Sequence, residues 1–347
     1  MQRKSIACII LTLAIVLTVA LALIVCQPSG VPQKTVVVYT SVDQVYSESV
    51  FKDFENRTGI QVLPVYDVEA AKTTGLVNRL IAEKSNPRAD VFWAGEFSQM
   101  ILLKNQSVLA PYQSPSGSDI PAQYHDTEGY WTGLGGRARV FIVNTDLLKP
   151  ADYPHSLDDM LSPAYPGNRI GIAYPMFGTT ATQAAALYST LGYDKAHAFF
   201  SNLSERGVRV VDGNSVVKDL VVSGQLDYGL TDTDDACTAI AQGSHVAIVV
   251  PDQGAGQRGT LVVPDTVALI AGSPHPAEGK VFIDYLLDKN TENDLVKSGW
   301  IQVPSRNVTT VIPCLNGTVI KPMTVNYQDI YDGVEMTKTD LADIFVR

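Results

Sequence analysis

The sequence predicts an α/β fold built as two lobes, and three observations lead to this prediction. Short apolar segments rich in β-branched residues alternate along the chain with segments whose apolar residues recur at helical spacing. The 347 residues are enough for about two domains. Hydrophobic residues make up 46% of the chain and charged residues 18%, a composition typical of packed globular proteins. Together these features predict two units in which helices cover a sheet.

The first unit is expected to follow the order strand, helix, strand, helix, strand. Its strands are predicted at 36–39, 61–65 and 89–94, and its helices at 45–58 and 74–84. In the first helix Val50, Phe51 and Phe54 fall on one face, and Gly59 is a typical helix stop. This alternation predicts a parallel sheet with helices on its faces.

The second unit begins near Val140 and repeats the alternation. Strands are predicted at 139–144, 169–173, 208–211, 227–230 and 246–250, and helices at 179–191, 194–203, 215–223 and from 234 onward. An apolar strand at 260–270 has the length of a segment that crosses between lobes, and helices at 276–287 and 291–298 follow it. The tail after Ile301 is expected to be rich in loops and to fold back over the body.

The first 26 residues have the pattern of a targeting segment. A short basic start precedes an uncharged, almost wholly apolar run at 5–25, and Cys26 ends this run. One interpretation is a signal peptide cut before a lipidated Cys26, because 23–26 resembles a lipobox except for Val25. The other is an uncleaved anchor, because about 20 apolar residues can span a bilayer. Residues 27–33 then form a spacer, and both interpretations predict an exported protein that is anchored to the membrane through its N-terminus.

The charge and the scarcity of catalytic motifs argue against several classes of function. The net charge of -10 argues against nucleic acid as a partner, because phosphate binding needs clustered Lys and Arg. The five histidines are scattered without metal-ligand spacing, and the sequence has no Gly-X-Ser-X-Gly motif. The sequence therefore predicts a binding protein without a cofactor, not an enzyme. The alternative is a metal-dependent hydrolase with its metal on Asp232, Asp234 and Asp235.

Two cysteines lie beyond the targeting segment, Cys237 and Cys314, and leave two possibilities open. They can form one disulfide in an oxidising compartment, or they can stay separate as buried thiols. Two cysteines are too few for a fold held together mainly by disulfides.

Polar residues follow the predicted strands, at the positions where α/β proteins bind ligands. In parallel α/β sheets the site lies beyond the carboxyl ends of the strands. The loops at these positions carry the candidate ligand-binding residues Asp43, Glu96, Thr179, Thr180, Asn214, Asp232, Asp234 and Asp235.

The run 231–236 places three of these acids within four residues. Like charges so close together raise each other's pKa unless a cation or a hydrogen-bond donor lies among them, which favours ligand contact. Acids directly before a helix also cap its backbone N–H groups. The two roles are compatible, since one acid can cap while another faces the ligand.

Two further segments carry donors for an anion. Arg137 and Arg139 stand at a glycine-flanked turn into a strand, on the same side of it, and arginine binds oxyanions through its planar fork of donors. Segment 177–180 has a glycine and two hydroxyls at a predicted helix N-terminus, where anions bind readily. Surface ion pairs of the arginines, and capping alone by the threonines, are the alternatives.

Several short segments, in their order and spacing, resemble one family of binding proteins. They are 38–39, 89–93, 136–140, 168–171, 214–216 and 224–227. From about Val36 to the tail, the chain resembles the periplasmic ferric-iron-binding proteins and their relatives, the type 2 solute-binding proteins of ABC importers. The resemblance implies a two-lobed periplasmic-binding-protein type II fold with a ligand cleft between the lobes. We expect lobe 1 at 34–138 and 262–305, and lobe 2 at 139–261 and 306–347.

The resemblance also implies roles for the candidate residues. Iron-binding members use a histidine, a glutamate and two adjacent tyrosines, and these positions correspond here to Asp43, Glu96, Asp234 and Asp235. Only the glutamate is kept, and the phenolates, which bind ferric iron strongly, are replaced by carboxylates. The anion-side positions correspond to Arg137 or Arg139, Thr179 or Thr180, and Asn214.

Three kinds of ligand suit a cleft with carboxylates on one wall and anion-binding donors on the other. The first choice is Fe³⁺ or another hard cation, bound with a synergistic anion. The alternatives are an aminophosphonate, which uses both walls, and a polyamine, which uses the acids alone. The ligand is expected to close the lobes of a monomer about a hinge, and the closed form to dock on an ABC permease in the membrane.

Overall fold

The computed structural model describes residues 33–67 and 74–345. The targeting segment with its lipidation site Cys26, and the spacer up to residue 32, lie outside the described residues, so both stay predictions. Among the described residues, no helix has both the length and the apolar composition that crossing a membrane requires. The fold described below is carried by the unit Thr35–Arg347.

The first sheet begins with three parallel strands, as the sequence predicts. They are β1 (Thr35–Thr40), β2 (Gln61–Tyr66) and β3 (Val91–Ala94), with β1 in the middle. The connecting helices are α2 (Gln44–Thr58) and α3 (Thr74–Ala82), and an unpredicted helix α4 (Ser98–Asn105) follows β3. Gly59 ends α2 in the left-handed conformation with φ 70°, which glycine adopts without strain.

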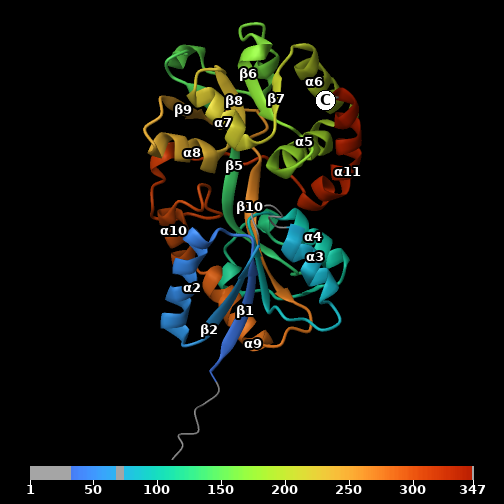
Figure 1. Cartoon of the computed structure of the whole chain (residues 1–347), viewed down its shortest axis with the longest axis vertical. Helices are drawn as coiled ribbons and strands as arrows, with labels where there is room; N and C mark the ends of the chain where they lie inside the picture. The colour runs from blue at the N-terminus through green and yellow to red at the C-terminus, as the bar shows by residue number, and fades with distance from the viewer. Residues whose placement is uncertain (1–32, 68–73, 346–347) are drawn as a thin grey trace, which may run out of the picture. The chain divides into compact units, whose positions relative to one another are not determined.

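Two long strands, β5 (Thr132–Asn144) and β10 (Val262–Ile270), run antiparallel to each other through the middle of the fold (Figure 1). β10 also pairs with β3 and with the short strand β4 (Leu109–Ala110). The first half of β5, up to Ala138, pairs with β10 in this sheet. From Arg139 onward β5 pairs with strands of a second sheet. The partner of β5 therefore changes at the position where the sequence predicts a lobe boundary, although the lobe ranges themselves stay a prediction.

The prediction of a glycine turn before Arg139 is wrong, because Gly135 and Gly136 lie inside β5. At this point the backbones of β5 and β10 come very close, and a Cβ atom on Gly136 would stand 2.2 Å from the carbonyl oxygen of Val263. The pairing register of the two strands also shifts, between Pro264 and Asp265. The glycines thus serve a close backbone approach beside a bulge, which the sequence pattern does not distinguish from a turn.

The second sheet contains the other half of β5 and four more strands. They are β6 (Ile170–Ala173), β7 (Arg209–Val211), β8 (Tyr228–Asp232) and β9 (Val246–Val249). β6 is parallel to both β7 and β8, whereas β5 is antiparallel to β8 and β9. The helices of this part are α5 (Gly178–Leu191), α6 (Tyr193–Glu205), α7 (Asn214–Val222) and α8 (Thr233–Ala241). The predicted alternation of strands and helices is confirmed here, to within a few residues at each end.

The tail differs from its prediction because it ends in a long helix. After α9 (Pro276–Leu286) and α10 (Lys289–Ser298), the chain runs through loops and then forms α11 (Tyr327–Ile344). The side chain of Asn326 caps α11 by accepting a hydrogen bond from the N–H of Gln328. α11 packs against α5 and α6, and Figure 1 shows it in red beside them. An apolar face with Ile330 and Leu341 predicts such a helix, so the signal was present in the sequence.

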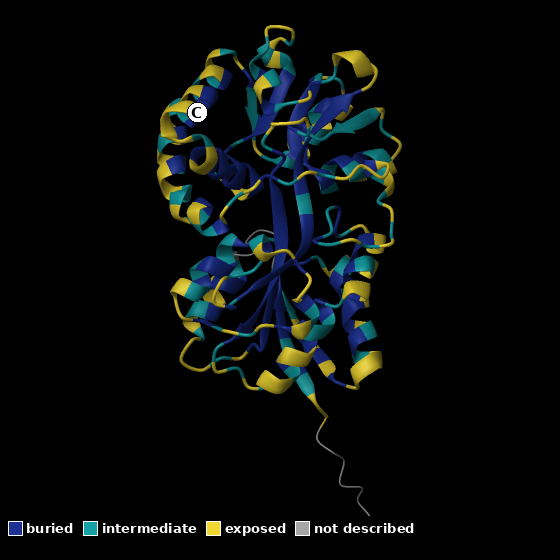
Figure 2. Ribbon diagram, turned by 180° about the vertical axis from the view of Figure 1, so that it is seen from behind, coloured by how far each residue is buried: buried dark blue, intermediate teal, exposed yellow. Residues whose placement is uncertain are grey.

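The core follows the central strands, and the outer helices bury one face and expose the other (Figure 2). Every residue of β10 is buried, and Trp93 and Phe92 of β3 are fully buried beside it. Cys237 of α8 and Cys314 form a disulfide, which decides between the two possibilities that the sequence leaves open. This bond ties the loop before α11 to the helix that begins with the acidic run.

Candidate ligand-binding site

The predicted site residues lie at element ends near the point where β5 passes from one sheet to the other. β5 itself carries Arg137 and Arg139. The acidic run begins α8 directly after β8, Asn214 begins α7, and the two threonines lie in the first turn of α5. Glu96 follows β3 in the first sheet, and Asp43 precedes α2.

Arg139 is fully buried, and protein groups satisfy its guanidinium. Its Nη1 donates to Asp232 Oδ1 at 2.8 Å, to Asn214 Oδ1 at 3.0 Å and to Thr179 Oγ1 at 3.1 Å. Its Nη2 donates to Thr180 Oγ1 at 3.2 Å, and its Nε donates to Gln183 Oε1 at 2.8 Å. The structure therefore brings the predicted anion-binding residues together, but around an arginine of the chain itself.

Asp232 is the counter-ion of this arginine, and both of its oxygens are occupied. Its Oδ2 accepts hydrogen bonds from the Thr179 hydroxyl at 2.6 Å and from Asn214 Nδ2 at 3.0 Å. A buried ion pair with its remaining lone pairs satisfied is stable in place, whereas loss of either charge is costly. Asp232 lies at the N-cap position of α8 without a side-chain capping bond, so the predicted capping role does not apply to it.

Arg137 is less buried than Arg139 and links the two sheets. Its Nη2 donates to the carbonyl oxygen of Gly95 at 3.2 Å, and its Nη1 lies 3.4 Å from Asp234 Oδ2. Burial alone lowers the pKa of the Arg137 side chain, but the surrounding carboxylates of Asp234, Asp232, Asp265 and Glu96 outweigh it and raise the pKa. Arg137 is thus a permanent cation in the centre of an acidic site.

The acids of the α8 run lie close enough together to share one cation. Single carboxylate oxygens of Asp232, Asp234 and Asp235 lie within 4.8 Å of one another. Burial, followed by repulsion from Asp234 and Asp232, raises the pKa of Asp235 to about 7. Burial also raises the pKa of Asp234, against the opposing effect of Arg137. Asp234 Oδ1 is buried without a hydrogen-bond partner among the described residues, so this oxygen is an unused acceptor.

Glu96 and Asp43 lie at the N-termini of two helices of the first sheet. The Glu96 carboxylate accepts hydrogen bonds from the Ser98 N–H at 2.9 Å, the Ser98 hydroxyl at 2.6 Å and the Gln99 N–H at 3.1 Å. The carboxylate thereby accepts hydrogen bonds from backbone N–H groups in the first turn of α4, which have no partner within the helix. This role is typical of acids at helix N-termini. Asp43 is partly exposed at the start of α2. Neither residue belongs to the group of three acids whose carboxylate oxygens lie within 4.8 Å of one another.

Asp265 is a site residue that the sequence analysis missed. It lies in β10, is 3% exposed, and its Oδ2 has no hydrogen-bond partner within the described part of the chain. Burial raises its pKa to about 7, with Arg137 and Trp300 acting in the opposite direction. Trp300 in turn lies 5.1 Å from the ring of Tyr46, centre to centre. One acid inside an otherwise apolar strand was the available signal.

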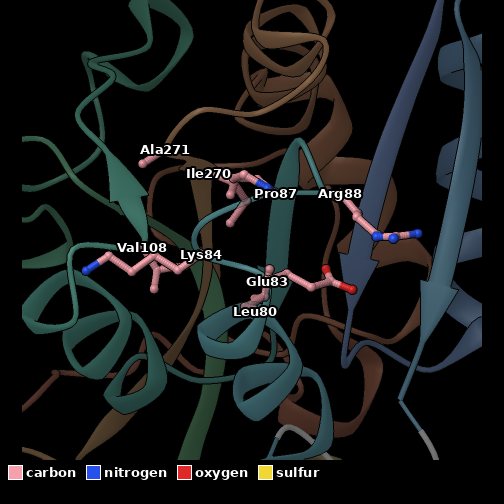
Figure 3. Close-up of a pocket in the computed structure, with 8 residues that line it drawn as sticks. All are labelled: Leu80, Glu83, Lys84, Pro87, Arg88, Val108, Ile270 and Ala271. Carbon is pink, nitrogen blue, oxygen red and sulfur yellow. The ribbon is translucent and has the colours of Figure 1, made fainter.

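Among the described residues, at least two cavities lie outside this cluster. One, of about 420 Å³, lies between the tail loop 302–322 and the segment 121–124, and Gln302 in its wall accepts a hydrogen bond from the Thr233 hydroxyl of α8. The other, shown in Figure 3, lies at the end of β10 between Leu80, Arg88 and Val108. Its volume of about 10 Å³ holds one water molecule, so it is too small for a solute.

Comparison with known proteins gives the family. Residues 86–325 match the family model described as bacterial extracellular solute-binding protein. The chain belongs to this family. The chain is 28% identical over 195 residues to the Fe(3+)-binding periplasmic protein of Serratia marcescens, and spans 56% of that protein's length. It is 26% identical over 261 residues to a putative 2-aminoethylphosphonate-binding periplasmic protein of Salmonella typhimurium, with 74% of each chain covered.

Solved structures of the same fold confirm the two-lobed α/β architecture. The open form of ferric iron-binding protein A from Mannheimia haemolytica superimposes with a TM-score of 0.80 at 22% identity, covering 90% of this chain and 98% of that one. A Trichodesmium protein in complex with iron and citrate gives a TM-score of 0.80 at 19% identity, covering 90% and 100%. At these identities the likeness concerns the fold alone. The relatives are solute-binding proteins of transport systems, in line with the prediction of a binding protein.

Proposed function

We propose that this protein is the extracytoplasmic capture subunit of an ABC importer, held at the membrane through its N-terminus and acting as a monomer. It binds a small solute at the junction of its two sheets and delivers the solute to a membrane permease. The family match and a relative described as a probable ABC transporter periplasmic-binding protein support this role. We infer that the solute carries positive charge, because Asp234 and Asp265 each have a buried carboxylate oxygen without a hydrogen-bond partner among the described residues. The site also contains two donors without such a partner, Arg137 Nε and Trp300 Nε1, which can bind an acceptor of the same solute.

Ferric iron with a synergistic anion is the first candidate for this solute. The observation that carries it is the group of Asp232, Asp234 and Asp235, whose oxygens lie within 4.8 Å of one another. Hard cations prefer such oxygen ligands. Because Arg139 already binds the Asp232 carboxylate, we propose Asp234 and Asp235 as the main ligands. Asp43 and Glu96 are proposed to approach the ion from the first sheet when the two lobes close. Three of the relatives are named for iron binding or iron uptake.

A small amine is the second candidate, and Asp265 favours it. This buried acid lies outside the group of three and beside the aromatic ring of Trp300. An acid and an aromatic face together bind organic ammonium groups. The aminophosphonate-binding relative provides a natural compound to test.

The test is ligand-induced thermal stabilisation of the full chain in detergent. Ferric citrate, 2-aminoethylphosphonate and putrescine are added separately to protein cleared of metal with a chelator. At a hundredfold excess over its dissociation constant, the true ligand should stabilise the protein by about 2.7 kcal/mol. D234N and D235N should lower the affinity for this ligand. D219N, which neutralises an acid on the exposed side of α7, should leave the affinity unchanged. Retained affinity in both site variants would show that the acidic run does not contact the ligand.

Catalysis is checked in the same samples. A metal-dependent hydrolase releases phosphate from a phosphate ester at a rate that depends on Asp234 and Asp235, whereas a capture subunit shows no turnover. Replacement of Cys26 by Ser tests the anchor separately. In a lipoprotein this substitution should release the protein from the membrane or block its processing, whereas with an uncleaved helical anchor it should change neither.

A further inference from the structure

We propose that Asp265 is a ligand-binding residue of this site and that it holds a protonated amine, with Asp234 facing it and Trp300 beside it. This inference rests on the proposed function and selects the second of its two candidates. The shared chemistry is a primary ammonium group, present both in aminophosphonates and in polyamines.

Without ligand, the carboxyl group of Asp265 is buried and incompletely hydrogen-bonded within the described chain. The side chain is almost completely buried, and its Oδ2 has no hydrogen-bond partner among the residues described. A buried carboxylate without a partner costs several kcal/mol, so such groups are rare unless something binds them. Arg137 does not fill this role, because its hydrogen bonds go to Asp234 and to the carbonyl of Gly95. The Trp300 indole N–H lies near enough to lower the pKa of Asp265, yet this N–H and Asp265 Oδ2 both lack a hydrogen-bond partner among the described residues, so the acid retains an unused acceptor.

The surroundings of Asp265 favour an organic cation. A Cβ atom on Gly95 would stand 3.5 Å from the Trp300 ring and 3.7 Å from Asp265 Oδ1, so glycine leaves the space between ring and carboxylate free of a side chain. Tyr46 packs against Trp300, with ring centres 5.1 Å apart. Aromatic faces attract ammonium groups and cover the alkyl chain behind them. Fe³⁺ needs several oxygens at once, and Asp265 lies outside the group of acids that are close enough to share a metal.

The position of Asp265 also explains how one ammonium group can bridge the two sheets. Asp265 belongs to β10 of the first sheet, whereas Asp234 begins α8, which follows β8 of the second. Each has one carboxylate oxygen without a partner in the described chain. A primary ammonium group has three donors, enough for both carboxylates and one more acceptor. Contacts to both sheets favour the closed arrangement of the two lobes.

The experiment is isothermal titration of the full chain with 2-aminoethylphosphonate, putrescine, ethylphosphonate and ferric citrate. Ethylphosphonate is the matched probe that lacks the amine. At least one amine should bind the wild-type protein. D265N should lower the affinity for that amine by about tenfold or more, which is the effect of losing a hydrogen bond to a charged group. If 2-aminoethylphosphonate is that ligand, ethylphosphonate should bind about tenfold more weakly than it does.

Asp252 provides the matched control. It is also a buried acid whose Oδ2 lacks a hydrogen-bond partner in the described residues, although Arg258 Nε lies 3.7 Å from this oxygen. Burial also raises the pKa of Asp252, but this acid lies in the loop before β10 and outside the site. D252N should keep the affinity of the amine within about twofold, as expected for a distant site. Melting curves are recorded for D265N, which should fold, since the substitution removes a buried charge and keeps the shape of the side chain.

The outcomes separate this inference from the proposed function. Binding of putrescine alone supports the amine subsite with a polyamine as its source, and binding of 2-aminoethylphosphonate alone supports it with an aminophosphonate. Unchanged amine affinity in D265N overturns the inference. If only ferric citrate binds, and D234N but not D265N weakens it, the inference is overturned while the proposed function stands. If none of the four compounds binds, both the inference and the two proposed ligand classes are wrong.

Discussion

Arg139 and Asp232 form a buried ion pair at the centre of the site, with further hydrogen bonds to residues of α5 and α7. Removing one charge from such a pair leaves the other buried without compensation. We expect R139M to lower the free energy of unfolding by about 3–5 kcal/mol, measured by urea denaturation. The double variant R139M/D232N should recover part of this loss, because it also removes the stranded acid.

The exposed pair of Lys52 and Glu48 gives the control for this prediction. Because water screens surface ion pairs, K52M should leave the denaturation curve unchanged within error. A similar small effect of R139M would mean that water or a rearranged side chain replaces the guanidinium, and that the pair is not essential to the fold.

The second prediction at this scale concerns pH, through Asp235 and Asp265. Burial raises the pKa of each to about 7, against an ordinary value of 3.8. Between these two values the folded chain keeps protons that the unfolded chain has already released. The ligand-free protein should therefore lose stability as the pH rises from about 4 to about 7, and lose no more through these groups above that range.

Urea midpoints measured across this pH range test the prediction. The double variant D235N/D265N should show a flatter dependence than the wild type, since asparagine does not titrate. D219N controls for the loss of a negative charge at an exposed position. If the double variant follows the wild-type curve, other groups cause the pH dependence.

Among the elements, α11 has the clearest single attachment. Asp340 of this helix accepts hydrogen bonds from Tyr188 and Tyr193, and its carboxylate lies 2.9 Å from the His197 ring. Burial raises the pKa of Asp340, but the hydrogen bonds from these three side chains outweigh it and lower the pKa. The stabilising effect of the carboxylate is therefore present above about pH 4 and lost as the pH falls through the lowered value.

We expect D340A to destabilise the packing of α11 by about 1–3 kcal/mol. Hydrogen exchange of residues 327–344 should become faster in this variant, while ligand affinity is kept, since α11 carries none of the proposed ligand contacts. D343A, at an exposed position on the same helix, is the matched control. Equal exchange rates in the two variants would contradict the proposed attachment.

The disulfide between Cys237 and Cys314 is the other connection between elements. It closes a loop across 77 residues of sequence and joins α8 to the tail. C237S/C314S should lower the free energy of unfolding by about 2–4 kcal/mol, because the unfolded chain becomes less constrained. Wild-type protein treated with a reductant should match the variant once thiol labelling confirms reduction. No change in the midpoint under these conditions would show that the bond adds little stability.

For the whole molecule, the two sheets joined by β5 and β10 are expected to move relative to each other when the solute binds. A ligand that contacts both sheets shifts the population toward a closed form by its difference in affinity. Small-angle scattering of the protein saturated with its ligand should give a smaller radius of gyration than the ligand-free protein. In D234N/D265N, which removes one contact from each sheet, the same ligand concentration should give a smaller change. An identical radius in the wild type with and without ligand would exclude closure.

Local sequence pattern determined much of the architecture. The apolar runs and helical spacings placed the alternating elements of both units, because secondary structure depends on periodicity within a few residues. The loops after the strands pointed to the acidic run of α8 and to Asn214, because the fold class itself fixes where strand ends meet. α11 was missed although its apolar face was readable, and β5 was expected to begin seven residues too late because its glycines resemble a turn.

Only the tertiary structure decided which of these polar residues are already occupied. Arg137 and Arg139 are two residues apart and have similar neighbours in the sequence. In the structure, however, Arg139 forms a buried ion pair with Asp232, whereas Arg137 contacts both Gly95 and Asp234. Asp265 joins the site from a distant apolar strand, and the local pattern shows only that this strand contains an acid, not which residues the acid meets. The sequence alone determines which groups carry charge and which segments become strands and helices. Burial and the pairing of charges depend on contacts between distant segments, and those exist only in the folded chain.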